Sequence, residues 1–516
     1  MASESIAASG VPLAGPPATV KVPDKGLKKN AIGYLSNVVI GVASTAPAYS
    51  LAATLGFIVA VKGVGIHAPA VLLVSFVPML LIAAAYRYLN RADPDAGTTF
   101  AWTTRALGPG LGWLNGWVIV LADVLVMASL SDIAAIYTFK LFGFTELGKS
   151  NAAIIVAAVI WIALMTWICY RGIELSARVQ QVLLTAEVVI LAVFAAVALA
   201  KVYGGHPAGS IQPKASWFDP TQMNFGDLVD GILLGVFIYW GWDTAVTVNE
   251  ESEDANEGPG RAAVVSTLLL LFIYLIVSTG AQSFHGPGFL ASEENASDVL
   301  NALGKGVLGA VGVKFLIVAV LTSASASTQT TILPTARTTL SMAVWKAVPG
   351  AIGRIHRRYL TPTVSTLGMG AASIIVTVVL ILISESVLAD SLTATGFGIC
   401  FYYGFTGVAC AVYYRRELFK SARKFLMLGL VPLAGAAILF GVFGKAAEFY
   451  GHKANVESPP IAGITLPLWL GVGGILLGFV LMLASRPFFR DFFKRKTESA
   501  PVGILDVPVE HAPAHF

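Results

Sequence analysis

Long apolar runs, separated by short polar segments, dominate the chain. A helix needs roughly 20 apolar residues to cross a bilayer, and about twelve runs reach that length. They cover approximately residues 33–60, 67–89, 111–140, 151–170, 179–202, 229–250, 262–284, 308–336, 362–384, 389–413, 425–446 and 464–485. The sequence lacks the short alternating segments typical of a membrane β-barrel. We therefore predict an all-α integral membrane protein with about 12 transmembrane helices.

Composition and charge placement support this class and suggest an orientation. Hydrophobic residues make up 56% of the 516 residues and charged residues 12%, which is too apolar for a soluble globule. With the N-terminus placed inside, the inner segments hold every arginine and the outer segments hold only lysines. This asymmetry predicts that both termini are cytoplasmic. A nucleic-acid-binding patch is the alternative, but the basic clusters lie directly beside predicted spans, so no nucleic-acid partner is expected.

Two of the predicted spans contain residues that interrupt helices. The first span carries Gly41, Ser44, Thr45 and Pro47 near its middle, and Gly241 and Asp243 interrupt the sixth span. Broken backbone at membrane depth is tolerated only where it is buried in protein or lines a cavity. A packing seam with a kink is the alternative for the first cluster, but the matching break in the sixth span favours a site.

The two breaks lie five spans apart, which predicts a particular organisation. We expect two five-helix halves, residues 31–205 and 206–415, related as an inverted repeat of the LeuT-like 5+5 type. Residues 416–487 then form helices 11 and 12, and residues 1–30 and 488–516 form cytoplasmic tails. Each break leaves N–H groups on one half-helix and carbonyls on the other, so the carboxylate and ammonium of a zwitterion each find a complementary end.

Four acids fall inside the predicted spans: Asp123, Asp132, Glu187 and Asp243. Acids at such depth are functional by default. We select Glu187 as a proton carrier, with a permanently protonated structural glutamate as the alternative. Asp243 is either a countercharge for a cationic substrate or a structural partner of the broken helix. The apolar helix has no periodicity that fixes which way Asp123 points. Asp132 is expected near the outer vestibule, and we assign no function to it.

Small hydroxyl residues and aromatics lie in or near the same spans. Residues 323–331 of the eighth span read SASASTQTT, so Ser327 and Thr328 are candidate sodium ligands. Close helix packing through small residues is the alternative. Aromatic residues flank the second break, and their faces can close over a substrate or stack on its cationic group.

The sequence offers no catalytic or metal centre. Cys169, Cys400 and Cys410 all lie in apolar spans without paired spacing, so neither a disulfide nor a metal site is expected. No Walker-type loop is present, and no span holds a nucleophile, base and acid at useful spacing. We therefore expect neither an enzyme nor a cofactor.

Several segments resemble amino acid-polyamine-organocation permeases. PDAGTTFAWTTRALGPGLGWLNGW (Pro94 to Trp117) is similar to the segment that follows their second helix, and YRGIELSARVQ (Tyr170 to Gln180) is similar to their loop between helices four and five. FIYWGWDTAVTVNEE resembles their helix six, and the matches run in order over residues 33–415. Two departures stand out: residues 43–47 read ASTAP where a Gly-Ser-Gly-Ile relative is common, and Glu187 stands where some proton-using members place a lysine.

The resemblance implies a secondary transporter of the plasma membrane that moves amino acids or related amines by alternating access. The substrate-binding residues expected from the breaks and the resemblance are Val42, Ala43, Ser44, Thr45, Ala46, Phe237, Trp240, Gly241, Trp242, Asp243 and Thr331, with Phe237 in the position of the helix-six gate. Glu187 is expected to couple transport to protons, and Ser327 and Thr328 offer sodium as the alternative ion. A substrate exchanger and a sensor without transport are the remaining alternatives.

Overall fold

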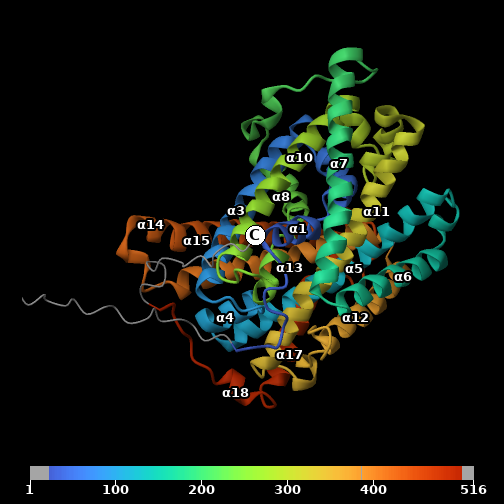
Figure 1. Ribbon diagram of the computed structural model, residues 1–516. Coiled ribbons are helices and arrows are strands. Elements are labelled where there is room, and N and C mark those ends of the chain that lie inside the picture. The colour runs from blue at the N-terminus through green and yellow to red at the C-terminus, as the bar shows by residue number, and fades with distance from the viewer. Residues whose placement is uncertain (1–22, 385, 502–516) are drawn as a thin grey trace, which may run out of the picture.

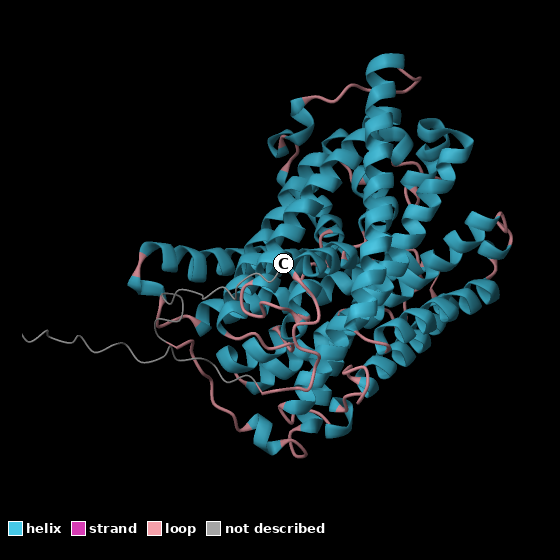
Figure 2. Cartoon of the chain, viewed as in Figure 1, coloured by secondary structure: helices cyan, strands magenta, loops and turns pink. Residues whose placement is uncertain are grey.

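The computed structural model describes residues 23–384 and 386–501. Within these ranges the chain forms helices and no β-strand, apart from three isolated bridges (Figure 2). The predicted all-α class is therefore confirmed. The helices are α1 Tyr34–Ser44, α2 Pro47–Ala60, α3 Ala68–Ala92, α4 Thr99–Leu107, α5 Pro109–Phe142, α6 Asn151–Tyr170, α7 Ile173–Gly205, α8 Phe225–Ile238, α9 Thr244–Thr247, α10 Gly258–Leu290, α11 Val299–Val344, α12 Thr363–Ile383, α13 Val387–Tyr413, α14 Ala422–Lys424, α15 Val431–Gly451, α16 Leu466–Leu470, α17 Val472–Ser485 and α18 Arg490–Phe493.

Eleven helical segments within the described residues are long and apolar enough to cross a membrane. The predicted spans include all of these and one more, the sixth, over residues 229–250. That region is divided into α8, a five-residue interruption, and the short α9, so it contains no continuous helix of membrane-spanning length. The count of twelve and the inverted repeat therefore remain predictions.

The buried core of the bundle surrounds the two interrupted helices. The α11 helix packs against α5 and α7, α13 packs against α5 and α15, and α10 packs against α3 and α7. Figure 1 shows α5, α11 and α13 near the middle, with α6 and α12 on one side and α14 and α15 on the other.

The outer helices expose large apolar side chains such as Ile160 on α6, Ile375 on α12 and Val480 on α17. Such a surface is suited to lipid rather than to water.

Candidate functional site

The first helix breaks at Thr45 and Ala46, as the proline and hydroxyl cluster predicts. Ala46 has a φ of 49°, a left-handed conformation that is rare for a residue with a side chain. Local hydrogen bonds hold this turn: the Thr45 hydroxyl donates to the Val42 carbonyl at 2.6 Å, and the Ser50 hydroxyl donates to the Thr45 carbonyl at 2.7 Å. Pro47 then begins α2 in the first turn, where its missing N–H costs nothing. These hydrogen bonds and the position of Pro47 therefore stabilise the break.

The second break meets the first one directly. Gly241 has a φ of 117°, and a Cβ at this position would lie 2.7 Å from the Ser44 carbonyl oxygen. Only glycine allows this approach without strain. The Ser44 and Thr244 hydroxyls share a hydrogen bond of 2.9 Å across the two breaks. The two interrupted helices are thus joined at their breaks, although they lie about 200 residues apart in sequence.

A small cavity of about 10 Å³ lies where the breaks meet. Its lining includes five of the predicted substrate-binding residues: Ser44, Trp240, Gly241, Asp243 and Thr331. The same lining contains residues that were not predicted to bind substrate: Ile119, Asp123, Thr244, Pro334 and Tyr402. This volume is about the size that one water molecule requires. An amino acid therefore fits only if the surrounding helices move apart.

Two buried carboxyl groups line this cavity. Asp243 accepts hydrogen bonds from the Tyr403 hydroxyl at 2.8 Å and from the Tyr402 hydroxyl at 3.3 Å. Asp123 accepts one from the Thr335 hydroxyl at 2.6 Å. No Lys, Arg or His is among the described residues that line the cavity. The site therefore favours a positively charged group, since an unpaired buried acid needs a proton or a cation.

The other predicted substrate-binding residues lie close to the breaks but do not line this cavity. Val42 contributes the carbonyl that holds the turn, and Ala43 and Ala46 are buried backbone positions of the same turn. Trp242 stacks on Tyr403, with ring centroids 5.1 Å apart, and packs edge-on against Tyr86. Its indole thus supports Tyr403, which in turn contacts Asp243.

The sequence pattern does not predict Tyr402 and Tyr403 as site residues, although both contact Asp243. They lie on α13 within the run GICFYYGF. Two adjacent tyrosines in the interior of an apolar span carry hydroxyls that need buried partners. That pair was the available signal, but only the fold shows which acid they meet.

Glu187 of α7 is completely buried and contacts the start of α2. Its Oε1 accepts hydrogen bonds from the Ala48 N–H at 2.7 Å and from the Ser323 hydroxyl at 2.8 Å. The Ser323 oxygen also accepts the Tyr49 N–H at 3.1 Å. Glu187 Oε2 has no hydrogen-bond partner within the described part of the chain. One oxygen therefore caps a half-helix, while the other remains available for a proton.

The hydroxyls of the two candidate sodium ligands are bonded to carbonyls. Ser327 donates to the Ser44 carbonyl at 2.8 Å, which links α11 to the first break. Thr328 donates to the Ala324 carbonyl of its own helix at 2.8 Å. This is the pattern expected of serine and threonine in helix packing.

A second, larger cavity of about 320 Å³ lies near the small one. Apolar side chains such as Phe57, Leu234 and Cys400 line most of it. Phe237 lines this larger cavity and Trp240 lines the small one, with their ring centroids 6.5 Å apart. The linings of the two cavities therefore adjoin at these two rings.

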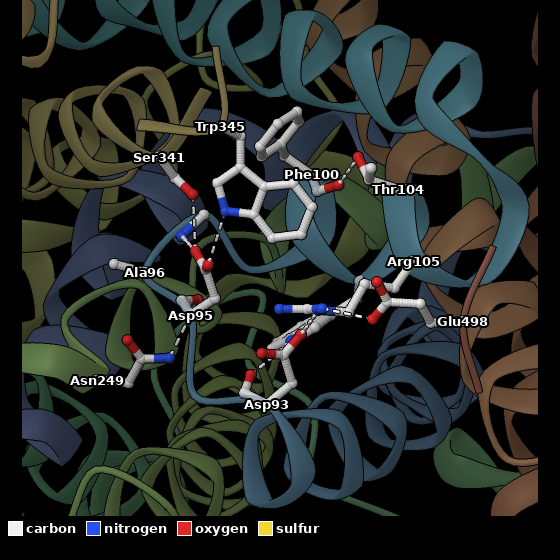
Figure 3. A network of polar contacts seen from close by, with 12 residues as sticks. Asp93, Asp95, Ala96, Phe100, Thr104, Arg105, Asn249, Ser341, Trp345 and Glu498 are labelled. Carbon is white, nitrogen blue, oxygen red and sulfur yellow. Dashed lines mark hydrogen bonds and ion pairs between the residues drawn. The ribbon is translucent and has the colours of Figure 1, made fainter. Parts of the chain in front are cut away.

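A dense polar network lies where α3 and α11 end. Buried Lys25 pairs with Asp95 at 3.1 Å and also with Glu250. Asp95 accepts further hydrogen bonds from the Ser341 hydroxyl at 2.7 Å and from the Trp345 indole at 3.2 Å (Figure 3). Burial alone would raise the pKa of Asp95, but Lys25 and Ser341 hold that pKa below its usual value. Asp95 therefore stays ionised at neutral pH.

A second set of ion pairs lies beside it. Arg105 of α4 pairs with buried Asp93 at 2.7 Å and with Glu498 of the C-terminal segment at 2.7 Å (Figure 3). Burial raises the pKa of Asp93 to about 6, despite the opposing effect of Arg105. Deeper in the bundle, Arg337 and Glu251 form a fully buried pair at 2.7 Å. Charge pairs thus link several chain segments in this part of the bundle.

Comparison with known proteins agrees with this architecture. The family described as Amino acid permease matches residues 32–483. The chain is 26% identical over 335 residues to the human Asc-type amino acid transporter 1, covering 63% of this chain and 62% of that protein, which is less than two thirds of its length. It is 23% identical to the branched-chain amino acid permease BcaP of Bacillus subtilis, covering 70% of this chain and 77% of that one. It is 22% identical to the low-affinity putrescine importer PlaP of Escherichia coli, covering 82% and 87%. This multi-pass membrane protein therefore belongs to the amino acid permeases of the amino acid-polyamine-organocation family.

Proposed function

We propose that this protein is a secondary transporter that moves amino acids or related amines across the plasma membrane. The observation that carries this proposal is the meeting of two broken helices around a cavity lined by Asp123 and Asp243. The relatives that transport amino acids or putrescine support the same substrate class. No chemical conversion of the substrate is part of the proposal.

The substrate's amino group is expected to bind beside Asp243. The Tyr402 and Tyr403 hydroxyls already orient this carboxyl group. Because Asp243 forms no ion pair with the described residues, a cationic substrate group can bind it without breaking one. A substrate carboxylate is expected at the first break, where the start of α2 carries partial positive charge. The Ala48 and Tyr49 N–H groups at this start are bonded to Glu187 and Ser323 in this conformation, so they have to be released before they can bind the carboxylate. The cavity of about 10 Å³ has to widen for either group to enter.

Transport is expected to proceed by alternating access between the two ends of the bundle. We expect the cavity of about 320 Å³ to be the approach to the site from one side, with the Phe237 and Trp240 rings as the gate that has to open. Opening toward the other side requires the Lys25 pairs with Asp95 and Glu250 to separate. The arginine-rich end is assigned to the cytoplasm together with both termini. The halves 31–205 and 206–415 are expected to move against each other around the breaks.

Glu187 is proposed to couple these movements to a proton. When it is ionised, its Oε1 is a strong acceptor for the Ala48 N–H at the start of α2. Protonation weakens that bond and frees α2 to shift relative to α7. Sodium is the alternative coupling ion, with Ser327 and Thr328 as its candidate ligands, but both hydroxyls are bonded to carbonyls in this conformation.

Uptake into liposomes tests the proposal. The purified protein is reconstituted, and uptake of labelled amino acids and polyamines is measured with an inward proton gradient, with an inward sodium gradient, and with internal substrate only. Uptake that follows the proton gradient and stops with a protonophore supports proton symport. Uptake driven only by sodium or only by internal substrate assigns a sodium symporter or an exchanger. Saturable binding without any flux would overturn the transporter proposal in favour of a sensor.

A further inference from the structure

A separate cavity of about 250 Å³ lies where α6 ends and α7 begins. Three chain segments contribute basic residues to its lining: Lys28 before α1, Arg171 and Arg178 around the start of α7, and Arg358 before α12. Glu174 is the acidic residue in the described lining, and Lys28 pairs with it at 2.8 Å. The cavity therefore has a net positive charge of three.

None of the three arginines is neutralised by an acid among the residues that the structure describes, and two of them are held by aromatic rings. No carboxylate in the described part of the chain lies within ion-pair distance of Arg171, Arg178 or Arg358. Instead, the Arg171 guanidinium lies over the Trp167 ring at 5.1 Å and over the Tyr359 ring at 5.2 Å, and the Arg358 guanidinium lies over Tyr359 at 5.7 Å. Stacking fixes a guanidinium plane but leaves its N–H groups free to bind an oxyanion.

Backbone donors reinforce the positive charge. The 33-residue helix α7 begins after Gly172 without a side-chain cap, and Gly172, Ile173, Glu174 and Leu175 all line the cavity. The first N–H groups of a helix have no partner within the helix and carry partial positive charge. A long helix and unpaired arginines thus converge on one cavity, as in anion-binding sites.

The surroundings of the cavity indicate where the anion comes from. Large apolar side chains are exposed on the two helices beside it: Leu164 and Trp167 on α6, and Leu175 and Val182 on α7. These residues belong to candidate membrane spans, so we expect them to face lipid chains. We propose that this cavity binds the phosphate headgroup of an anionic phospholipid, whose acyl chains lie along α6 and α7. The proposal does not depend on which substrate the protein transports.

Thermal unfolding of the purified full-length protein in detergent tests this site. The apparent unfolding temperature is measured while dioctanoyl phosphatidylglycerol, dioctanoyl phosphatidylcholine or inorganic phosphate is titrated. The test variant is Arg178→Gln with Arg358→Gln. The matched control is Arg416→Gln with Arg423→Gln, which removes two exposed arginines outside the cavity lining. Both variants lose the same charge.

Phosphatidylglycerol is expected to raise the unfolding temperature saturably, and phosphatidylcholine is not. The test variant should need about 30-fold more phosphatidylglycerol, because each basic side chain near an anionic lipid contributes about fivefold, while the control should match the wild type. An equal loss in both variants would show a general charge effect and overturn the site. Stabilisation by inorganic phosphate at the same concentrations would overturn the lipid assignment. If the double variant does not fold, Arg178→Gln alone is used, because the Arg178 side chain is exposed and makes no hydrogen bond or ion pair with the described residues.

Discussion

The Ala48 N–H donates a hydrogen bond of 2.7 Å to Glu187 Oε1, and this bond joins the half-helix α2 to the middle of α7. The two residues lie 139 positions apart in sequence. Ala48 is in the first turn of α2, so Glu187 occupies the place that a capping side chain usually takes. A change in the charge of this one carboxyl therefore acts directly on the helix break at the candidate site.

Glu187→Gln is expected to remove the proton dependence of transport. The amide keeps an oxygen that accepts the Ala48 N–H, so the fold of the break is preserved, but the side chain no longer gains or loses a proton. Uptake by the variant should not respond to a proton gradient, while exchange of internal for external substrate persists. The measurement is labelled uptake into liposomes with and without a protonophore.

Ser323→Ala serves as the matched control for this prediction. It removes the second donor to Glu187 Oε1 but leaves the carboxyl in place. Its transport should still respond to the proton gradient. Proton-stimulated uptake by Glu187→Gln would show that this residue is a structural acid.

Gly241→Ala is expected to abolish high-affinity substrate binding. The added Cβ would lie 2.7 Å from the Ser44 carbonyl oxygen, and the φ of 117° is unfavourable for alanine. The strain of about 1–3 kcal/mol forces the two breaks apart. Gly368→Ala on α12 is the control, because a Cβ there meets nothing within 4 Å. Equilibrium binding of a labelled substrate distinguishes the two, and wild-type affinity in Gly241→Ala would mean that the breaks do not form the site.

Asp243→Asn is expected to weaken binding of amine-bearing substrates about 10- to 100-fold, since a charge-assisted hydrogen bond contributes about 1.5–3 kcal/mol. The asparagine keeps the size of the side chain and an acceptor for Tyr403. Asp132→Asn is a suitable control, because Asp132 lines a different cavity, together with Lys140 and Asp298. Competition binding with a panel of amines provides the measurement. Equal weakening in both variants would contradict a specific role for Asp243.

Local sequence patterns predicted the breaks well, because their causes are local. Pro47 restricts the backbone angles at its own position, and Gly241 allows a positive φ at its own. The structure places the two interruptions beside these residues. Contacts to the acids depend on distant elements instead. Nothing near Asp243 in sequence indicated Tyr402 and Tyr403, and an apolar helix has no periodicity that orients its polar residues.

The ion pairs of Lys25 and Arg105 are equally hard to predict from the sequence. Lys25 falls in the predicted tail of residues 1–30, yet it is buried against Asp95 and Glu250. Glu498 falls in the predicted tail of residues 488–516, yet it pairs with Arg105. The charge pattern indicated only the side of the membrane for these segments. Which opposite charges meet is decided by the tertiary fold.

Asp93 is expected to make stability depend on pH near 6. Burial raises its pKa from 3.8 to about 6 in the folded protein. The folded state thus binds this proton more tightly than the unfolded chain does, so the contribution is full below pH 3.8 and is lost as the pH rises through about 6. The apparent unfolding temperature in detergent should fall over this interval. Asp93→Asn should flatten that part of the profile, and an unchanged profile would contradict the assignment.

Arg105→Gln is expected to destabilise the protein far more than Glu498→Ala at neutral pH, although both substitutions break the same pair. Arg105 also neutralises Asp93, which is completely buried, and an unpaired buried charge costs about 3–5 kcal/mol. Glu498 is 57% exposed at its side chain, where an ion pair contributes about 0–1 kcal/mol. Acidification should relieve the Arg105→Gln defect, because protonation of Asp93 removes the uncompensated charge. Apparent unfolding temperatures at pH 5 and pH 8 test this order, and a defect in Arg105→Gln that is independent of pH would show that lost packing, not charge, is its cause.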